Sequence, residues 1–368
     1  MPNLDQQKHD LNTMRILQII HSPEPGGIQT IAQAISRGLA AHGLEFETAY
    51  LRRDAGFSRW PTFVGALRVA AKILTKRYDA LIAYQATASI TVGAIGFLVG
   101  VPRRIVHQTA MLPAMGGSIR YLDKIAGTLG LYSFNVANSA ATQQQFADYP
   151  KRYRRCLVLI EHGVELRAAA RSRSDTLAHF GIPDDGPILL NTARLAKDKN
   201  QAVLFHAMRN LPGLRLVLAG SGPCEAEYRD LIKQLGLEDR VQLLGPVPHR
   251  AVPDLYAAAD IFVFPTLHET FGLSAVEAGM QGLPSIVSDI AAMREVLTID
   301  GRAIASFVDP RNPVAWEMAI RSVLEQPLCA EERKRFALGL SAKYEQEKML
   351  KGYLDVLMSQ DGRQLSVS

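Results

Sequence analysis

Short apolar runs alternate with longer stretches in which apolar residues recur every three or four positions. The runs predict buried parallel strands, and the longer stretches predict amphipathic helices between them. In the first half of the chain, the predicted strands are residues 14–20, 47–51, 80–84, 104–107, 133–137 and 156–160. In the second half, they are residues 188–192, 215–219, 241–244, 261–264 and 285–287. This alternation predicts parallel sheets covered by helices on both faces.

The alternation breaks once and restarts, which predicts two α/β units. An Arg-rich, irregular stretch separates them near residues 165–185. We expect a disordered tail over 1–13, an N-terminal domain over 14–168, a linker over 169–186, a C-terminal domain over 187–340 and a final segment over 341–368. The last helical pattern, about residues 330–358, is long enough for that segment to cross back to the N-terminal domain. Two doubly wound units in tandem would bind ligands at the carboxyl ends of their strands, facing a central cleft.

Composition favours a globular protein without a metal or disulfide framework. The chain has 368 residues, 48% of them hydrophobic, which is enough for two separate cores. Its three cysteines, Cys156, Cys224 and Cys329, are far apart and lack metal-ligand spacing. No secretory signal opens the sequence, so we expect a cytoplasmic protein in a reducing compartment.

One uncharged segment, residues 80–102, has the length of a membrane span. Polar residues such as Gln85 and Thr87 interrupt it, and its first five residues have the length of a core strand. A strand, a loop and a buried helix therefore fit this segment better than a span.

Positive charge gathers in the first half of the chain. Residues 1–165 hold 18 Lys and Arg against 11 Asp and Glu, whereas the remainder holds 23 against 25. Arg68, Lys72 and Lys76 recur at helical spacing, with Phe63 and Leu67 nearby. Such a half can lie peripherally on an anionic membrane or present an ordinary solvated helix face, and the pattern leaves both open. No nucleic-acid-binding motif accompanies the charge, so nucleic acid is not an expected partner.

Two glutamates, Glu269 and Glu277, flank a predicted strand-to-helix turn between the strand 261–264 and a helix over about 272–281. The start of that helix would offer the backbone N–H groups of Phe271, Gly272 and Leu273. A diphosphate is favoured at such a helix N-terminus. At the helical rise per residue the two glutamates would stand roughly 12 Å apart, which suits an activated sugar. The alternative is that Glu269 caps the helix and Glu277 is merely solvated.

Other candidates follow strands at their carboxyl ends. Arg194 and Lys199 come after the first strand of the second unit, where they could neutralise a diphosphate or form a solvated charge run. His107 closes a strand of the first unit, where a lone histidine is more often structural. The glycines that could let a ligand approach the backbone, or simply form tight turns, are Gly26, Gly27, Gly220 and Gly222.

The stretch FPTLHETFGLSAVEA, residues 264–278, together with Gly-Leu-Pro at 282–284, resembles the signature of family 4 retaining glycosyltransferases. The other candidate residues match that family's landmarks in order and spacing, and the resemblance runs from about residue 15 to 353. It implies the α/β class and the GT-B fold, in which two Rossmann-like doubly wound domains face a central cleft. The N-terminal domain would bind the acceptor and the C-terminal domain the nucleotide-sugar.

The resemblance also implies roles for individual residues. The expected catalytic residues are Glu269, Arg194, Lys199 and His107. The expected donor-binding residues are Gly26, Gly27, Gly220, Gly222, Phe271, Gly272, Leu273 and Glu277. Glu277 would hold the ribose, whereas Glu269 would face the hexose and the diphosphate. His107 and Gly27 would complete the site on cleft closure.

The implied activity is retaining transfer of a hexose from a UDP- or GDP-sugar to a lipid-linked or growing oligosaccharide, in bacterial polysaccharide or lipopolysaccharide biosynthesis. No cofactor is expected, and the lack of an Asp-x-Asp triplet predicts metal-independent transfer. His162 and Gln108 depart from the family pattern, which leaves details of sugar and base contact open. Two alternatives remain, a nucleotide-sugar 2-epimerase of similar shape and a non-catalytic sugar-nucleotide-binding protein. For the epimerase, no acid and base groups around the donor C2 can be assigned.

Overall fold

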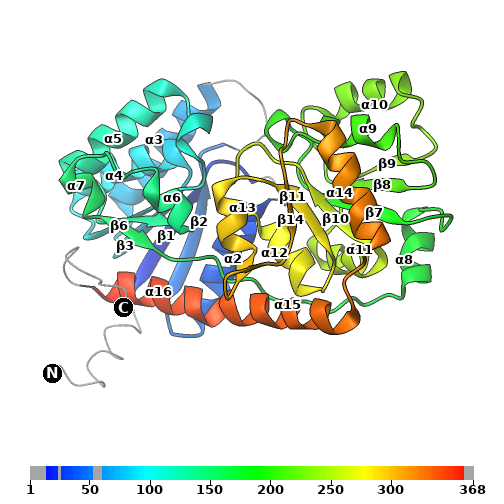
Figure 1. Ribbon diagram of the computed structural model, residues 1–368. Coiled ribbons are helices and arrows are strands. Elements are labelled where there is room, and N and C mark those ends of the chain that lie inside the picture. Colours follow the sequence, from blue (N-terminus) through cyan, green and yellow to red (C-terminus); the bar gives the residue numbers. More distant parts are fainter. Residues whose placement is uncertain (1–13, 24–25, 53–59, 360–368) are drawn as a thin grey trace. The chain divides into compact units, whose positions relative to one another are not determined.

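The computed structural model describes residues 14–23, 26–52 and 60–359 (Figure 1). The chain divides into two units. Unit 1 comprises Met1–Gly163 with Gln346–Ser368, and unit 2 comprises Val164–Glu345. The tail 1–13, predicted to be disordered, lies outside the described residues, as do residues 53–59 in the positively charged first half of the chain.

Unit 1 is built on a parallel sheet, sheet A, with the strand order β2-β1-β3-β4-β5-β6. Its strands are β1 (Arg15–Ile20), β2 (Glu45–Tyr50), β3 (Ala80–Tyr84), β4 (Arg103–His107), β5 (Phe134–Ala137) and β6 (Leu157–Leu159). Its helices are α2 (Gly27–Ala40), α3 (Trp60–Thr75), α4 (Ala86–Val99), η1 (Leu112–Ala114), α5 (Gly117–Leu129), α6 (Ala140–Gln144), α7 (Lys151–Arg154) and α16 (Gln346–Met358). Strand β3 is buried along its whole length, because helices cover both faces of a central parallel strand.

The uncharged segment after residue 80 forms β3 and then α4, as predicted. Helix α4 ends at Gly100, whose left-handed backbone (φ 79°) lets its N–H bond to the carbonyls of Gly96 and Phe97. Its buried side includes Gly93 and Gly96, which allow close packing on Tyr132 and Leu81. Within the described residues, no helix combines the length and apolar character needed to cross a bilayer.

Unit 2 is built on a second parallel sheet, sheet B, with the strand order β14-β11-β10-β7-β8-β9. Its strands are β7 (Ile188–Thr192), β8 (Arg215–Ala219), β9 (Val241–Gly245), β10 (Ile261–Phe264), β11 (Ser285–Ser288) and β14 (Ser306–Val308), with a small antiparallel pair β12 (Thr298–Ile299) and β13 (Arg302–Ala303). Its helices are α8 (Arg173–Phe180), η2 (Lys197–Lys199), α9 (Ala202–Met208), α10 (Glu225–Gln234), η3 (His249–Ala251), α11 (Val252–Ala258), α12 (Leu273–Met280), α13 (Ala291–Val296), α14 (Pro313–Glu325) and α15 (Ala330–Lys343).

Sheet B is buried on both faces, since neighbouring residues of one strand enter different cores. Leu190 and Phe262 pack in one cluster of buried residues. Their neighbours Leu189 and Val263 pack in the other. This is the two-residue period of a strand between two helical layers. The prediction of two α/β units with parallel sheets is confirmed.

Two expectations need correction. The stretch 169–186, predicted to be a linker, contains helix α8 and belongs to unit 2. The Ser172 side chain caps this helix by accepting from the N–H of Asp175, and Gly181 ends it in the left-handed region (φ 61°). The helical pattern at 330–358 forms two helices, α15 and α16, because Tyr344 leaves the helical conformation between them. The division between the units falls at this break.

Candidate functional site

In unit 2, the turn between β10 and α12 places backbone N–H groups at the start of a helix. Gly272 precedes α12 in the left-handed region (φ 82°), and a Cβ there would lie 2.5 Å from Cε of Met293. The Phe271 ring is 1% exposed and packs edge-on against Tyr344. The Phe271 ring is therefore part of the core and is not available to a ligand. The first N–H groups of a helix have no acceptor within it, so they favour an anion.

Lys199 and Glu269 meet at this edge of sheet B. The Lys199 ammonium lies 2.8 Å from Oε2 of Glu269, and Oε1 of Glu269 accepts from the N–H of Thr270 at 3.1 Å. The two side chains are only 20% and 17% exposed. Burial lowers the pKa of Lys199, but the Glu269 carboxylate more than offsets this and holds that pKa above its usual value. Lys199 is therefore charged at neutral pH and held in place by Glu269.

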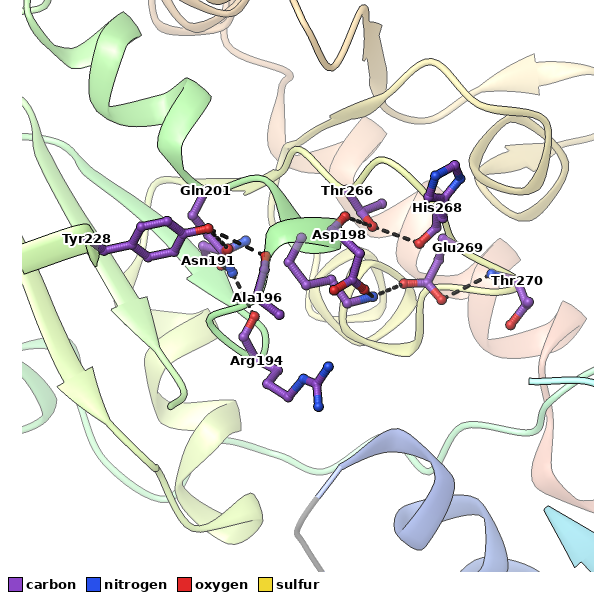
Figure 2. Close-up of polar contacts among 11 residues, drawn as sticks. Asn191, Arg194, Ala196, Asp198, Gln201, Tyr228, Thr266, His268, Glu269 and Thr270 are labelled. Atoms are coloured by element: carbon purple, nitrogen blue, oxygen red, sulfur yellow. Dashed lines mark hydrogen bonds and ion pairs between the residues drawn. The ribbon is translucent and has the colours of Figure 1, made fainter. Parts of the chain in front are cut away.

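The loops that carry this pair are tied together by further hydrogen bonds (Figure 2). The N–H of Leu267 donates to the carbonyl of Asp198 at 2.8 Å, and Oγ1 of Thr266 donates to the same carbonyl at 3.2 Å. Nδ2 of Asn200 donates to the carbonyl of Pro265 at 3.1 Å. The loop after β7 and the loop after β10 thus form one rigid platform around the ion pair.

Arg194 stands on the same loop as Lys199 but is exposed, and within the described residues its guanidinium has no hydrogen bond or ion pair. Its positive charge acts to lower the pKa of Lys199, so the two cations are neighbours. Figure 2 shows the Arg194 side chain pointing away from the buried amides of Asn191 and Gln201 behind it. Gln201, which is fully buried, donates to the Arg194 carbonyl at 3.0 Å and so supports this loop from below.

Gly220 and Gly222 pack directly against the Arg194 loop. A Cβ at Gly220 would lie 2.1 Å from the carbonyl oxygen of Ala193, and one at Gly222 would lie 2.3 Å from that of Leu195. The N–H of Leu195 also donates to the carbonyl of Ser221 at 3.0 Å. A side chain at either glycine would therefore displace the loop that carries Arg194. The predicted contact of these glycines with a donor stays a prediction.

Glu277 occupies a different environment from Glu269. It is the fifth residue of α12, so it lies little more than one turn from the start of that helix. The Tyr256 hydroxyl donates to its Oε2 at 3.0 Å, and Nε2 of His249 lies 3.6 Å from its Oε1. Tyr256 is buried, and burial together with the Glu277 charge raises its pKa well above the usual value. Tyr256 therefore stays protonated and donates to the carboxylate.

A pocket that is partly open to solvent lies beside Glu277. Its apolar lining includes Leu166, Val252 and Pro253, and Arg167 supplies a cation. Nη1 of Arg167 lies 3.1 Å from Nδ1 of His249, which continues the polar chain from Glu277. Sequence reasoning missed Arg167, His249 and Tyr256, because no motif distinguishes them and only the fold brings them to Glu277.

In unit 1, His107 ends β4 and is 1% exposed. Its ring stacks on His162 and on Tyr353 at centroid distances of 5.4 and 6.2 Å. Within the described residues, neither of its ring nitrogens has a hydrogen-bond partner. Burial lowers the pKa of His107 to about 4, so the ring is neutral at pH 7.

The glycine pair of unit 1 opens helix α2. Gly26 precedes the helix with extended backbone (φ 172°), and no atom lies within 4 Å of where its Cβ would be. Gly27 is the first residue of α2. The structure thus gathers Arg194, Lys199, Glu269 and Glu277 on unit 2, and it places His107, Gly26 and Gly27 on unit 1. Among the residues it describes, no three His, Cys, Asp or Glu side chains form a metal-binding group.

Comparison with known proteins places this architecture in the GT-B class. Sucrose-phosphate synthase from Thermosynechococcus elongatus superposes with a TM-score of 0.78 at 20% identity, covering 94% of this chain and 98% of that one. Anabaena HepE in complex with UDP-glucose superposes with a TM-score of 0.77 at 19% identity, covering 94% and 99%. At these identities the likeness establishes the fold.

Sequence comparison adds a match over part of the chain. Residues 172–338 match the family described as Glycosyl transferases group 1. A D-inositol 3-phosphate glycosyltransferase of Corynebacterium kroppenstedtii is 31% identical over 188 residues, which are 48% of this chain and 39% of that protein. The chain thus spans well under two thirds of the length of this curated relative.

Proposed function

We propose that this protein is a retaining, metal-independent glycosyltransferase that moves a hexose from a UDP- or GDP-sugar to a lipid-linked or growing oligosaccharide. The pathway we propose is bacterial polysaccharide or lipopolysaccharide biosynthesis. The observation that carries the proposal is the 2.8 Å ion pair of Lys199 and Glu269 beside the start of α12, with Arg194 next to it. The family match and the likeness to a UDP-glucose complex support it.

In this proposal the diphosphate of the donor binds at the start of α12. The N–H groups of Gly272 and Leu273 point to its oxygens, and Arg194 contributes a cation that pairs with no carboxylate of the described residues. Lys199 is neutralised by Glu269 in the free protein, so its electrostatic contribution comes when negative charge develops on the leaving phosphate. Metal independence rests on these cations, which supply the charge that a metal ion provides elsewhere.

Glu277 and its pocket receive the nucleoside. The Tyr256 hydroxyl occupies one carboxylate oxygen, and the other is available to accept from a ribose hydroxyl. The pocket lined by Leu166, Val252 and Pro253 offers an apolar surface to the base, and Arg167 offers donors to its carbonyl groups.

The reaction proceeds without a protein nucleophile. The bond from the sugar C1 to the diphosphate oxygen breaks, and the acceptor oxygen forms its bond to C1 on the same face, so configuration is retained. The acceptor proton passes to the departing phosphate. Glu269, held by Lys199 and the N–H of Thr270, orients the hexose through its hydroxyls rather than attacking C1.

Incubation with UDP-, GDP- and ADP-hexoses tests the proposal. Slow release of the nucleotide by hydrolysis of one donor, with the anomeric product identified by NMR, supports retaining transfer. Excess EDTA should leave the rate unchanged. Formation of a 2-epimer would instead identify an epimerase, and binding in a thermal-shift assay without any turnover would identify a binding protein.

A further inference from the structure

Helices α3, α4 and α5 lie side by side on one face of sheet A (Figure 1). Val69 of α3, Val92 of α4 and Ala126 of α5 pack into one core cluster with strand residues such as Leu81 and Val106. The opposite sides of the same three helices are exposed. Ten of the fifteen large exposed hydrophobic side chains among the described residues lie on these helices. We call them the apolar face: Phe63, Leu67, Leu74, Phe97, Leu98, Val99, Tyr121, Leu122, Ile125 and Leu129.

The apolar side chains follow the helical repeat, so each helix presents a continuous stripe. On α3, Phe63, Leu67 and Leu74 are 56%, 55% and 66% exposed and recur at intervals of four and seven residues. On α5, Leu122 and Leu129 have the same seven-residue interval. This is an amphipathic pattern with both sides apolar, one side packed in the core and the other exposed.

The end of α4 contributes the most exposed part of the face. Phe97, Leu98 and Val99 are consecutive, and Leu98 is 83% exposed. Helix α4 carries no charged residue at all. A helix end with three consecutive exposed apolar residues is costly in water, so it indicates a surface that is covered by a partner.

The charge around the apolar face is positive. Helices α3, α5 and α7 carry seven basic residues, Arg68, Lys72, Arg120, Lys124, Lys151, Arg152 and Arg154. The one acidic residue of these helices, Asp123, is fully buried and accepts hydrogen bonds from Tyr132 and Tyr153 at 3.0 and 2.6 Å. No exposed carboxylate from these helices therefore opposes an anionic partner.

Not every basic residue is available to a partner. Lys72 and Lys76 both bind Glu47, at 2.7 and 3.3 Å, and together with the Tyr78 hydroxyl they lower the pKa of Glu47 to about 2. Arg68 and Arg120 are exposed, and no carboxylate pairs with either among the described residues. Of the three basic residues at positions 68, 72 and 76, Lys72 and Lys76 are thus partly neutralised by Glu47. Arg68 has no carboxylate partner among the described residues.

We infer that the apolar face docks on the surface of an anionic lipid bilayer, with its side chains in the interfacial layer and Arg68 and Arg120 against lipid phosphates. Exposed apolar residues between cations are the combination that such a surface binds. A second copy of the chain would set the same positive charges against each other, so charge complementarity favours lipid. The inference does not depend on sugar transfer, since lipid binding is measured without a donor.

Vesicle flotation of the full-length protein tests this inference. The protein should bind vesicles of phosphatidylcholine with phosphatidylglycerol, and not vesicles of phosphatidylcholine alone. Leu67→Glu combined with Leu98→Glu should weaken binding about tenfold or more, because both residues would place a carboxylate at the lipid surface. Arg68→Ala combined with Arg120→Ala should weaken it several-fold and reduce its dependence on salt.

Leu338→Glu is the matched control, because Leu338 is 61% exposed and lies on α15 of unit 2. It should bind vesicles like the unaltered protein, and circular dichroism should confirm that every variant is folded. Equal binding by the Leu67/Leu98 variant and the control would overturn the inference, as would failure of the unaltered protein to float with anionic vesicles. Dimers in sedimentation that the Leu67/Leu98 variant disperses, without any lipid binding, would assign the face to a second copy instead.

Discussion

The side chains at the carboxyl edges of the two sheets differ in charge. At the edge of sheet B, carboxylates are paired, since Lys199 forms an ion pair with Glu269 and the Tyr256 hydroxyl donates to Glu277. At the edge of sheet A, His107 is a neutral ring stacked between His162 and Tyr353, with hydrogen-bonding capacity that the described residues leave unused. We therefore expect unit 2 to bind a charged ligand and unit 1 to offer neutral polar contacts.

The largest expected effect comes from the ion pair of unit 2. Lys199→Ala or Glu269→Ala should reduce turnover by about 10² or more, because each leaves a partly buried charge without its partner and removes a preorganised group. Steady-state release of nucleotide from the donor measures this. Glu225→Ala, which breaks a 2.8 Å pair with Arg229 on α10, should leave turnover unchanged.

The double variant sharpens this prediction. If Lys199 and Glu269 served only to neutralise each other's charge, the variant that lacks both would regain activity along with stability. We expect stability to recover in part and turnover to remain low. Recovery of normal turnover would show that neither residue acts on the substrate.

A second effect concerns the loop that holds Arg194. Gly222→Ala should lower the free energy of unfolding by about 2 kcal/mol, because its Cβ would lie 2.3 Å from the Leu195 carbonyl and the loop would have to move. Urea unfolding measures the change, and turnover should fall with it. Gly117→Ala is the control, since no atom lies within 4 Å of the corresponding Cβ. Equal stability of the two variants would refute the packing role of Gly222.

The stacked histidines of unit 1 predict a loss of stability as the pH falls, with the same sign as for a salt-bridged carboxylate but at a higher pH. The pKa of His107 is about 4 when folded and 6.5 in the reference state, so the unfolded chain binds the proton more readily. Stability should be complete above pH 6.5 and fall by about 2 kcal/mol at pH 5 through His107 alone. His162, whose pKa is also lowered by burial, should add to this loss.

Thermal unfolding at pH 7 and pH 5 measures this dependence. His107→Phe keeps an aromatic ring in the stack but cannot titrate, so the difference between the two pH values should shrink. An unchanged difference would mean that the group responsible lies elsewhere.

The smallest effect concerns the Glu277 pocket. Tyr256→Phe removes the hydroxyl that donates to Glu277, and it should weaken binding of a nucleoside diphosphate about tenfold. Isothermal titration with UDP and GDP measures this, and Tyr50→Phe, at a 37% exposed position of unit 1, is the control. If Tyr256→Phe bound the nucleotide as tightly as the unaltered protein, Tyr256 would have no role in nucleotide binding.

Long apolar runs made much of the fold predictable from sequence. The boundaries of β3, β7, β8 and β10 agree with the predicted residues, because each is a run of four or five buried positions. Strand β14 was missed because it has three residues and lies at a sheet edge. Helix α8 was missed although Ser172 and Gly181 mark its ends, since its polar composition hid the helical period.

The site was predictable only in part, because its partnerships are tertiary. The sequence identified Glu269 and Lys199 as separate candidates. It could not predict that these residues, 70 positions apart, form one ion pair. The predicted separation of Glu269 and Glu277 also assumed helical rise from Glu269 onward, whereas α12 starts only at Leu273. The partners of Glu277 come from another strand-to-helix connection and carry no motif of their own.

The position of a bound nucleoside diphosphate tests the central claim most directly. In crystals of the protein soaked with UDP or GDP, we predict phosphate oxygens at hydrogen-bond distance from the N–H of Leu273 and from the Arg194 guanidinium, with a ribose hydroxyl on Glu277. A nucleotide bound elsewhere, with the start of α12 and the Glu277 pocket unoccupied, would contradict the account.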